Sequence, residues 1–196
     1  MNCLTKLSLS LILAILSNYT NAQEYRHGLG AQLTTGIFNS VYENEYGQVW
    51  DEPEFAYVPG AVYKASVAFD INRDLSFSVA AYPFLGLNRN SLTGGYFGFE
   101  LPILGEFFFG DIDDFGVFLG TGFNYGIIAH SGYGSGQIFG PTFDGGLQFP
   151  LREQIVELKL GYTLGLNNEL SKFPDLTVTK DSRSIFSVGL LYMIGY

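Results

Sequence analysis

The sequence predicts an all-β protein, an eight-stranded antiparallel up-and-down transmembrane β-barrel. Three observations support this fold class. The closing segment, residues 185–196, alternates bulky apolar side chains with mostly small ones and ends on the aromatic Tyr196, which is typical of outer-membrane barrels. The connections between alternating segments are short and long in turn, and one face of every segment is apolar and uncharged. A barrel that is surrounded by lipid has both of these properties.

The first 22 residues have the pattern of a secretory signal. They carry one cation, Lys6, then an apolar run over residues 7–16, and then small residues that end at Ala22. We therefore expect residues 1–22 to be a signal peptide and residues 23–196 to be an outer-membrane β-barrel domain. The apolar run is too short for a transmembrane helix, which needs about 20 residues. Cys3 is the chain's single cysteine, so the processed chain would contain no disulfide.

Eight alternating segments follow, each about as long as a tilted strand that crosses a bilayer. In each segment the outward-facing side chains are bulky and apolar, which supports its assignment as a strand that contacts lipid. The predicted strands cover residues 28–38, 60–70, 75–85, 97–109, 115–127, 139–149, 155–166 and 184–196. The corresponding outward residues are Leu29, Leu33 and Ile37; Tyr63, Val67 and Phe69; Leu75, Phe77 and Val79; Phe97, Phe99, Leu101, Ile103, Phe107 and Phe109; Val117, Leu119, Phe123, Tyr125 and Ile127; Phe143, Leu147 and Phe149; Val156, Leu158, Leu160, Tyr162 and Leu164; and Phe186, Val188, Leu190, Tyr192, Ile194 and Tyr196.

The links between these strands set the orientation. Links 71–74, 110–114 and 150–154 are short, whereas links 39–59 and 167–183 are the longest. Transmembrane barrels have short turns on the periplasmic side and long loops outside. We therefore expect both ends of the chain, and all the short turns, on the periplasmic side.

The net charge is −9 and becomes −10 when Lys6 leaves with the signal peptide. An acidic chain without a basic tract is a poor match for nucleic acid. We expect outer-membrane lipid as the surrounding partner and no nucleic acid.

The inward face is small and polar, and it includes charges. We expect a structural charge network in the lumen, formed by Lys64, Glu100, Glu106, Asp144, Glu157 and Lys159. Charges in a confined interior are expensive unless they are paired, and eight strands enclose only enough space for side chains. A soluble lipocalin-like barrel stays open as the least favoured alternative, because it would need a more apolar interior.

The hairpin between the sixth and seventh strands predicts one pair directly. If Leu151 and Arg152 lie in the turn, Leu147 faces Val156 outside and Asp144 faces Lys159 inside. The sequence therefore predicts an ion pair between Asp144 and Lys159, with Glu157 close by. Lys64 could similarly neutralise Glu100 or Glu106. Pro102 cannot donate a ladder hydrogen bond, so we also expect a local bulge there.

A family resemblance rests on the central strands. Residues 99–104, Phe-Glu-Leu-Pro-Ile-Leu, are followed by Phe107 to Phe109, a short acidic turn, and Phe118-Leu-Gly-Thr-Gly. This stretch resembles the paired central strands of the Bacteroidetes outer-membrane β-barrel family, often called PorT-like. The chain length and closing strand are similar too, whereas Gly105-Glu106 and Thr121-Gly122 depart from the common pattern. The resemblance implies a small barrel of the cell envelope with no defined activity.

Signals for chemistry are sparse. His130 and Ser131 are adjacent in a predicted strand and would point to opposite faces, so they make a poor catalytic dyad. His27 lies at the opposite end of the barrel. Two distant histidines form no metal cluster, and Asp111, Asp113 and Asp114 lack the remaining ligands of a calcium loop. We expect no catalytic residue, no cofactor and no metal site.

Three classes of function remain open. A structural or interaction barrel would present aromatic residues in its outer loops to envelope proteins or polysaccharide, as a monomer. The alternatives are a lipid-modifying enzyme and a narrow transport pore. The candidate loop residues are Tyr42, Tyr46, Trp50, Phe55, Tyr57 and Phe173.

Overall fold

The chain folds as a closed antiparallel barrel in the computed structural model, which describes residues 23–44, 46–90, 94–110, 114–130, 134–152, 154–166, 172–173 and 176–195. The predicted signal peptide lies outside these residues. The strands are β1 Gln23–Asn44, β2 Val49–Asn72, β3 Leu75–Ala81, β4 Phe84–Asn90, β5 Gly94–Gly110, β6 Gly116–His130, β7 Gly134–Leu151, β8 Gln154–Leu164, β9 Lys172–Phe173 and β10 Leu176–Gly195.

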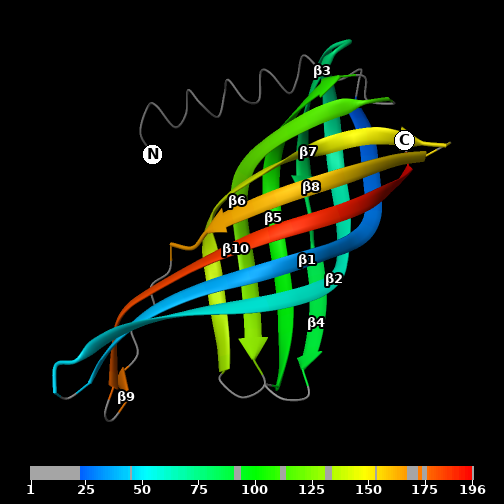
Figure 1. Cartoon of the computed structure of the whole chain (residues 1–196). Helices are drawn as coiled ribbons and strands as arrows, with labels where there is room; N and C mark the ends of the chain where they lie inside the picture. Colours follow the sequence, from blue (N-terminus) through cyan, green and yellow to red (C-terminus); the bar gives the residue numbers. More distant parts are fainter. Residues whose placement is uncertain are drawn as a thin grey trace, which may run out of the picture.

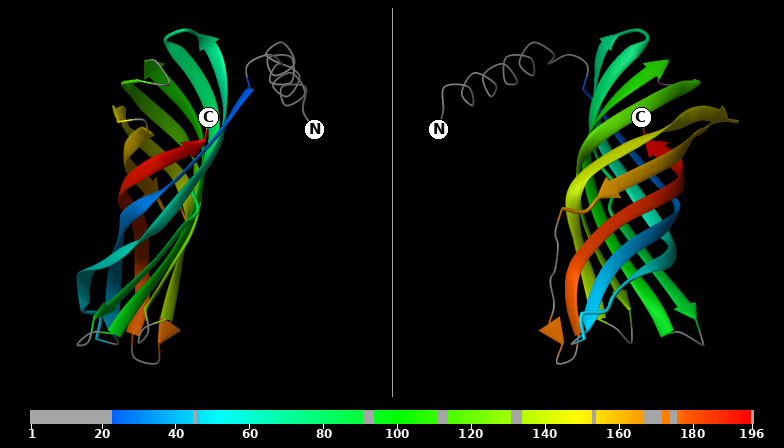
Figure 2. Two further views of the ribbon diagram at one scale, coloured as in Figure 1. Left: turned by 90° about the vertical axis from the view of Figure 1, so that its right-hand side faces the viewer. Right: turned by 60° about the vertical axis from the view of Figure 1, so that its left-hand side comes forward.

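Sequential strands pair with each other around the ring, and β10 closes it by pairing with β1. Strands β3 and β4 are successive parts of one ring position, and β9 is a short addition to β10, so the ring has eight strands (Figures 1 and 2). The predicted eight-stranded up-and-down barrel is confirmed. No helix in the described part of the chain is long and apolar enough to cross a membrane.

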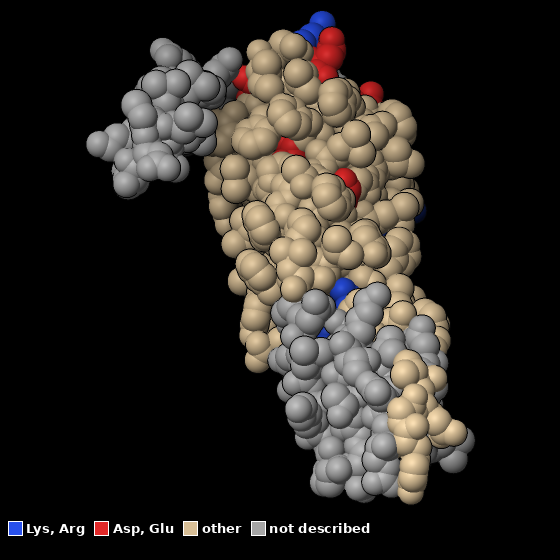
Figure 3. All heavy atoms as spheres, turned by 90° about the vertical axis from the view of Figure 1, so that its left-hand side faces the viewer, with Lys and Arg blue, Asp and Glu red and all other residues tan. Residues whose placement is uncertain are grey.

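The two faces of the wall have the predicted contents. Outward side chains such as Leu119 and Phe123 are more than half exposed, whereas the inward Glu106 and Glu157 are almost completely buried. Figure 3 shows that the wall on this face consists mainly of uncharged side chains, with a few charged ones visible among them and at its upper end. Exposed apolar residues around the whole ring need a hydrocarbon environment, because water would leave this area unfavourably solvated.

The third strand is interrupted at Tyr82 and Pro83, between β3 and β4. The predicted bulge at Pro102 is wrong: Pro102 faces Asn124 in a β5–β6 ladder without a register shift. The break lies in the neighbouring strand instead. Tyr82 N donates to Pro102 O at 3.0 Å, and Pro102 has no N–H to return the bond. Loss of that bond, together with the missing N–H of Pro83, divides the strand without adding a residue.

The hairpin between β7 and β8 has a different register from the predicted one. Leu151 pairs with Gln154, so Arg152 lies in the turn, and Leu147 faces Leu158 instead of Val156. Arg152 adopts a positive φ of 62°, which two-residue hairpin turns require. The shift is two residues. It therefore leaves every side chain on its predicted face.

The outer ends of the strands separate into two groups. The β2–β4 ladder stops at Gly60 and Gly86, while β1 stays paired with β2 as far as Glu43 and with β10 as far as Asn44. We call residues 35–44 of β1, 49–59 of β2 and 176–184 of β10 the outer ribbon. It runs beyond Leu164, where β8 ends.

Side chains bridge the two sides of this separation. Asn88 Nδ2 donates to Tyr57 O at 2.7 Å, and Tyr96 Oη donates to Glu54 Oε1 at 2.8 Å. On the other side Arg183 Nη1 donates to Gln137 O at 3.1 Å. The inner half of the barrel is thus closed by backbone ladders, and the outer half partly by side chains.

Candidate functional site

The lumen is filled by a polar network near the middle and the short-turn end. Lys64 on β2 is its first centre. Its Nζ lies 2.6 Å from Glu157 Oε2 on β8 and 3.3 Å from Glu106 Oε2 on β5. Sequence reasoning offered Glu100 or Glu106 as the partner of Lys64. The structure brings Lys64 to Glu106, and the stronger contact is with Glu157.

Tyr82 joins the members of this network. Its hydroxyl donates to Glu106 and is 3.2 Å from Glu157 Oε1. Its ring lies 3.9 Å from Lys159 Nζ and 5.1 Å from Lys64 Nζ, measured to the ring centroid. Cations over an aromatic face are attracted by the ring quadrupole. One buried tyrosine therefore contacts two carboxylates and two ammonium groups.

The predicted pair between Asp144 and Lys159 is present. Lys159 Nζ lies 3.3 Å from Asp144 Oδ2, and both side chains are almost fully buried. The contact is an ion pair without the alignment of a hydrogen bond. Because Asp144 pairs with Gly161 in the β7–β8 ladder, the long Lys159 side chain reaches it diagonally.

Glu100 accepts hydrogen bonds from a second group of side chains, which are uncharged. Thr34 Oγ1 donates to Glu100 Oε1 at 2.6 Å, and Asn124 Nδ2 donates to Glu100 Oε2 at 3.0 Å. Asn124 also reaches Thr163 Oγ1 at 3.0 Å. This chain of hydrogen bonds crosses the lumen from β1 to β8 and fixes Glu100 without a direct lysine contact among the described residues.

An apolar cluster fills the lumen on the side of the outer ribbon. Ile138, Ile185 and Phe84 are at most 1% exposed, and Phe38 and Tyr96 pack against the cluster. The remaining buried members are Ala56, Val58, Val62, Ala80, Tyr82, Leu104, Ile128 and Leu191. Packed side chains of this kind fill the interior of a narrow barrel.

The candidate loop residues lie on the outer ribbon and near it. Tyr46 is 80% exposed in the connection between β1 and β2, and Phe55 and Tyr57 are exposed on the outward face of β2. Phe55 and Tyr57 are therefore strand residues, not loop residues. Tyr42 lies in β1, Trp50 in β2 and Phe173 in β9, and the positions of their side chains are outside what the structure describes.

The histidines are far apart in the fold. His130 is half-buried at the outer end of β6 with its ring 4.6 Å from that of Tyr96. His27 lies near the start of β1, where its Nδ1 is 3.2 Å from Tyr63 Oη. The described residues contain no group of three or more His, Cys, Asp or Glu side chains that could hold a metal. Ser131, Asp111 and Asp113 lie outside the described residues.

Sequence reasoning missed Tyr82 and Thr34. A signal for each was present, because both continue the inward phase of their strands, Tyr82 after Ser76 and Ser78 and Thr34 after Gln32. The partners of the Tyr82 side chain could not be predicted from strand alternation, because they depend on which strands face each other across the lumen.

The comparisons with known proteins identify the fold. No protein-family model and no curated protein sequence matches the chain. Among solved structures, the outer membrane protein AlkL in lipid bilayers matches with a TM-score of 0.50 at 9% identity, over 88% of this chain and 92% of AlkL. OprG, an outer membrane protein of Pseudomonas aeruginosa, matches with 0.42 at 13%, over 87% and 98%. Ail, the attachment invasion locus protein of Yersinia pestis, matches with 0.43 at 14%, over 85% and 99%. At 9% identity the likeness to AlkL shows the barrel fold alone.

Proposed function

We propose that this protein is a non-enzymatic, monomeric barrel of the Gram-negative outer membrane that acts through its outer ribbon and outer loops. The observation that carries the proposal is the contrast between the lumen and the outer ribbon. The lumen is filled by ion pairs and the apolar cluster, whereas the outer ribbon extends past the β2–β4 ladder and past the end of β8 and exposes aromatic side chains. The partner would be an envelope protein or polysaccharide that contacts aromatic anchors.

The orientation follows from the topology. The turns β2–β3, β5–β6 and β7–β8 are short and lie at one end with the C-terminus (Figure 1). Short turns face the periplasm in transmembrane barrels, so the outer ribbon would face the cell exterior. Cleavage of the signal peptide near Ala22 would place Gln23 at the periplasmic rim.

In-cell photocrosslinking tests the interaction role. A photoreactive residue at position 46 should form an adduct with an envelope protein or polysaccharide, because Tyr46 is 80% exposed in the connection between the ribbon strands β1 and β2. The same residue at position 123, on the lipid-facing wall, is the matched control and should yield lipid adducts only. Identical adducts at both positions, or none at position 46, would contradict the proposal.

A conductance measurement tests the pore alternative. The purified barrel should produce no ion-conducting steps in a planar bilayer, because buried side chains from opposite walls meet in the lumen. Regular single-channel steps that persist with pure protein would exclude a sealed barrel.

The enzyme alternative is tested on lipid A. Overexpression should leave the lipid A mass spectrum unchanged, since His130 packs against Tyr96 and the two described histidines lie at different ends. A mass change that disappears in His130→Ala would overturn the non-enzymatic assignment.

Kinship with the PorT-like barrels of Bacteroidetes rests on residues 99–104 and 107–109, which form the β5 side of the β5–β6 hairpin. Related chains should keep the inward Glu100 together with its partner Thr34. Their separate loss in an aligned family would remove this support.

A further inference from the structure

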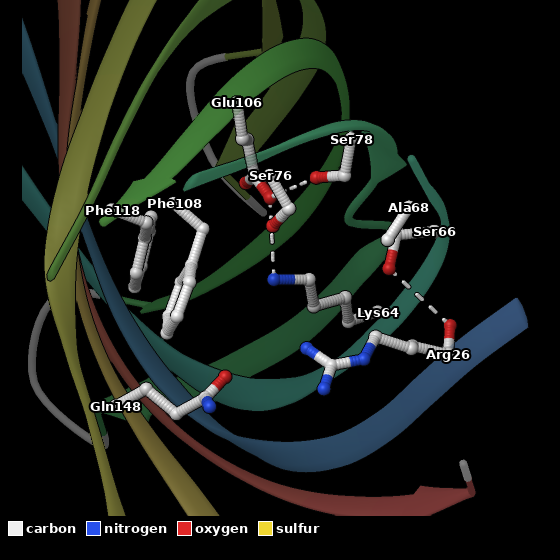
Figure 4. Close-up of a pocket in the computed structure, with 10 residues that line it drawn as sticks. All are labelled: Arg26, Lys64, Ser66, Ala68, Ser76, Ser78, Glu106, Phe108, Phe118 and Gln148. Atoms are coloured by element: carbon white, nitrogen blue, oxygen red, sulfur yellow. Dashed lines mark hydrogen bonds and ion pairs between the residues drawn. The ribbon is translucent and has the colours of Figure 1, made fainter. Parts of the chain in front are cut away.

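The two ends of the barrel wall are held together differently. At the short-turn end, backbone ladders join the strands all around the ring, and side chains such as Lys64 and Glu106 meet in the lumen beside a cavity of about 20 Å³ (Figure 4). At the outer end the β2–β4 ladder stops at Gly60 and Gly86, and β8 ends at Leu164. Within the described residues, the outer ribbon therefore has no ladder to β4 or to β7.

The outer ribbon is itself a continuous three-stranded sheet. Its central strand, β1, pairs with β2 as far as Glu43 and with β10 as far as Asn44. In Figure 1 the outer ends of β1, β2 and β10 lie together, away from the outer ends of β4, β5, β6 and β7. Proteins open locally in cooperative units that coincide with such motifs. The internal ladders thus make the ribbon one body.

Side-chain hydrogen bonds latch one edge of this body to the rest of the wall. Asn88 Nδ2 on β4 donates to Tyr57 O, and Tyr96 Oη on β5 donates to Glu54 Oε1 at 2.8 Å. Both bonds are exposed to solvent, where water replaces a broken partner at little cost. The latch is therefore weaker than the ladders on either side of β1.

The apolar contacts below the ribbon are also modest. Ala56 and Val58 of β2 are 0% exposed and belong to the apolar cluster, where Phe84 and Ile138 are the larger members from the opposite wall. Burial stabilises in proportion to the apolar area removed from water. Alanine and valine contribute little area, so lifting the ribbon costs less than separating two large side chains.

We propose that the outer ribbon is a strap across the outer end of the lumen, which swings outward as one body from a latched to a released state. The bend would lie where the β2–β4 ladder ends at Gly60 and the β8–β10 ladder ends at Ser184. In the released state Ala56 and Val58 leave the apolar cluster. The proposal is independent of the interaction role above, because it concerns how the ribbon is held and not what it binds.

Distances between pairs of nitroxide labels, measured by pulsed electron paramagnetic resonance in lipid vesicles, test the strap. One pair replaces Phe55 of the ribbon and Tyr125 of β6, and should show a shorter, latched distance and a longer, released one. The control pair replaces Phe69 and Leu119, which belong to the same two strands where the ladders between them are unbroken. It should show a single distance.

A change at the latch should shift these populations. Tyr96→Phe removes the hydroxyl that reaches Glu54 and keeps the ring, so the ratio of released to latched molecules should rise, by up to about tenfold for one hydrogen bond. Tyr57→Phe is the matched control on the ribbon. It should leave the ratio unchanged, because Tyr57 accepts the Asn88 bond through its backbone oxygen.

Cysteine labelling gives a second measurement on the same strand. Val58 and Val62 both face the lumen and are at most 1% exposed, but only Val62 lies within the β2–β4 ladder. Val58→Cys should react with a water-soluble maleimide, and faster when combined with Tyr96→Phe, whereas Val62→Cys should stay unreactive. A single distance between positions 55 and 125 that Tyr96→Phe leaves unchanged, or equally slow labelling at positions 58 and 62, would overturn the proposal.

Discussion

Lys64 is held between Glu106 and Glu157 in the lumen, with all three side chains buried. Removing one member of a buried ion pair leaves an uncompensated charge, which costs about 3–5 kcal/mol. We therefore predict that Lys64→Met lowers the free energy of unfolding by that amount. Urea unfolding in lipid vesicles measures it, with the exposed Arg73→Gln as control. Equal stability of the two variants would show that the network contributes little to the free energy of unfolding.

Tyr82 offers a finer change at the same network. Tyr82→Phe removes the hydroxyl that contacts Glu106 and Glu157 but keeps the ring near Lys159. An unsatisfied buried acceptor costs about 1–3 kcal/mol, so we expect a loss in this range in the same unfolding measurement. The outward-facing Tyr125→Phe is the matched control and should change stability by less. If Tyr82→Phe left the free energy of unfolding unchanged, the Tyr82 hydroxyl would not stabilise the network.

At the residue scale the sequence predicted which charges face inward, because alternation assigns each residue to a face. It also predicted the Asp144–Lys159 pair, although through a register that is two residues off. An even shift preserves faces, and a lysine is long enough to reach across the difference. The partner of Lys64 was not predictable in full, since Glu157 is 93 residues away and meets it only across the closed ring.

Pro59 explains why the β2–β4 ladder ends. Tyr63 N donates to Pro83 O at 3.0 Å, so odd-numbered residues of β2 direct their N–H groups toward the third strand. Pro53 and Pro59 are also odd-numbered residues of β2, and proline has no N–H to donate. Proline on a sheet edge prevents further pairing. The separation of the outer ribbon from β4 therefore originates in the sequence.

We predict that Pro59→Val lets the β2–β4 ladder extend toward Leu87. One added hydrogen bond contributes about 0.5–1.5 kcal/mol, so the Leu87 amide should exchange with deuterium up to about tenfold more slowly in Pro59→Val than in the wild type. Pro53→Val, farther along the ribbon, is the control and should leave exchange near Leu87 unchanged. Unaltered exchange in Pro59→Val would mean that strand geometry, and not the proline, ends the ladder.

At the element scale the bilayer-crossing part of each strand was predicted and the outer extensions were not. Alternation is enforced where one face contacts hydrocarbon. Beyond that depth both faces can be polar, so β1 and β2 continue past their predicted ends at residues 38 and 60 without an alternating signal. The division of the third strand depends on Pro83, a local signal within the predicted strand, and on Pro102 of the neighbouring strand, whose effect on the third strand no local pattern indicates.

The whole molecule depends on lipid contact along the outer wall. Phe123 is 56% exposed near the middle of β6, and Leu151 is 56% exposed beside the β7–β8 turn. An arginine at mid-bilayer costs about 2–4 kcal/mol, against about 0–1 kcal/mol near the interface. We predict this ordering for Phe123→Arg and Leu151→Arg in vesicle unfolding experiments. Equal costs at the two positions would contradict a membrane-spanning wall.

The fold as a whole was predictable because two independent signals, alternation and link length, agree in this chain. The candidate sites were predictable only in part. The cavity at the short-turn end is lined by both Arg26 and Gln148, which are 122 positions apart in the sequence, and such a meeting follows from ring closure and strand tilt. Composition and local pattern do not specify it.

Spin-label accessibility along β6 tests the central claim most directly, because the processed chain would lack native cysteine. Single cysteines at each position from Val117 to Ile127 carry a nitroxide label in the barrel reconstituted in lipid vesicles. Collision with oxygen, which concentrates in hydrocarbon, should be high at odd-numbered positions and low at even-numbered ones. Uniform accessibility, or odd-numbered positions that collide mainly with a water-soluble reagent, would contradict a barrel with hydrocarbon outside and a sealed polar interior.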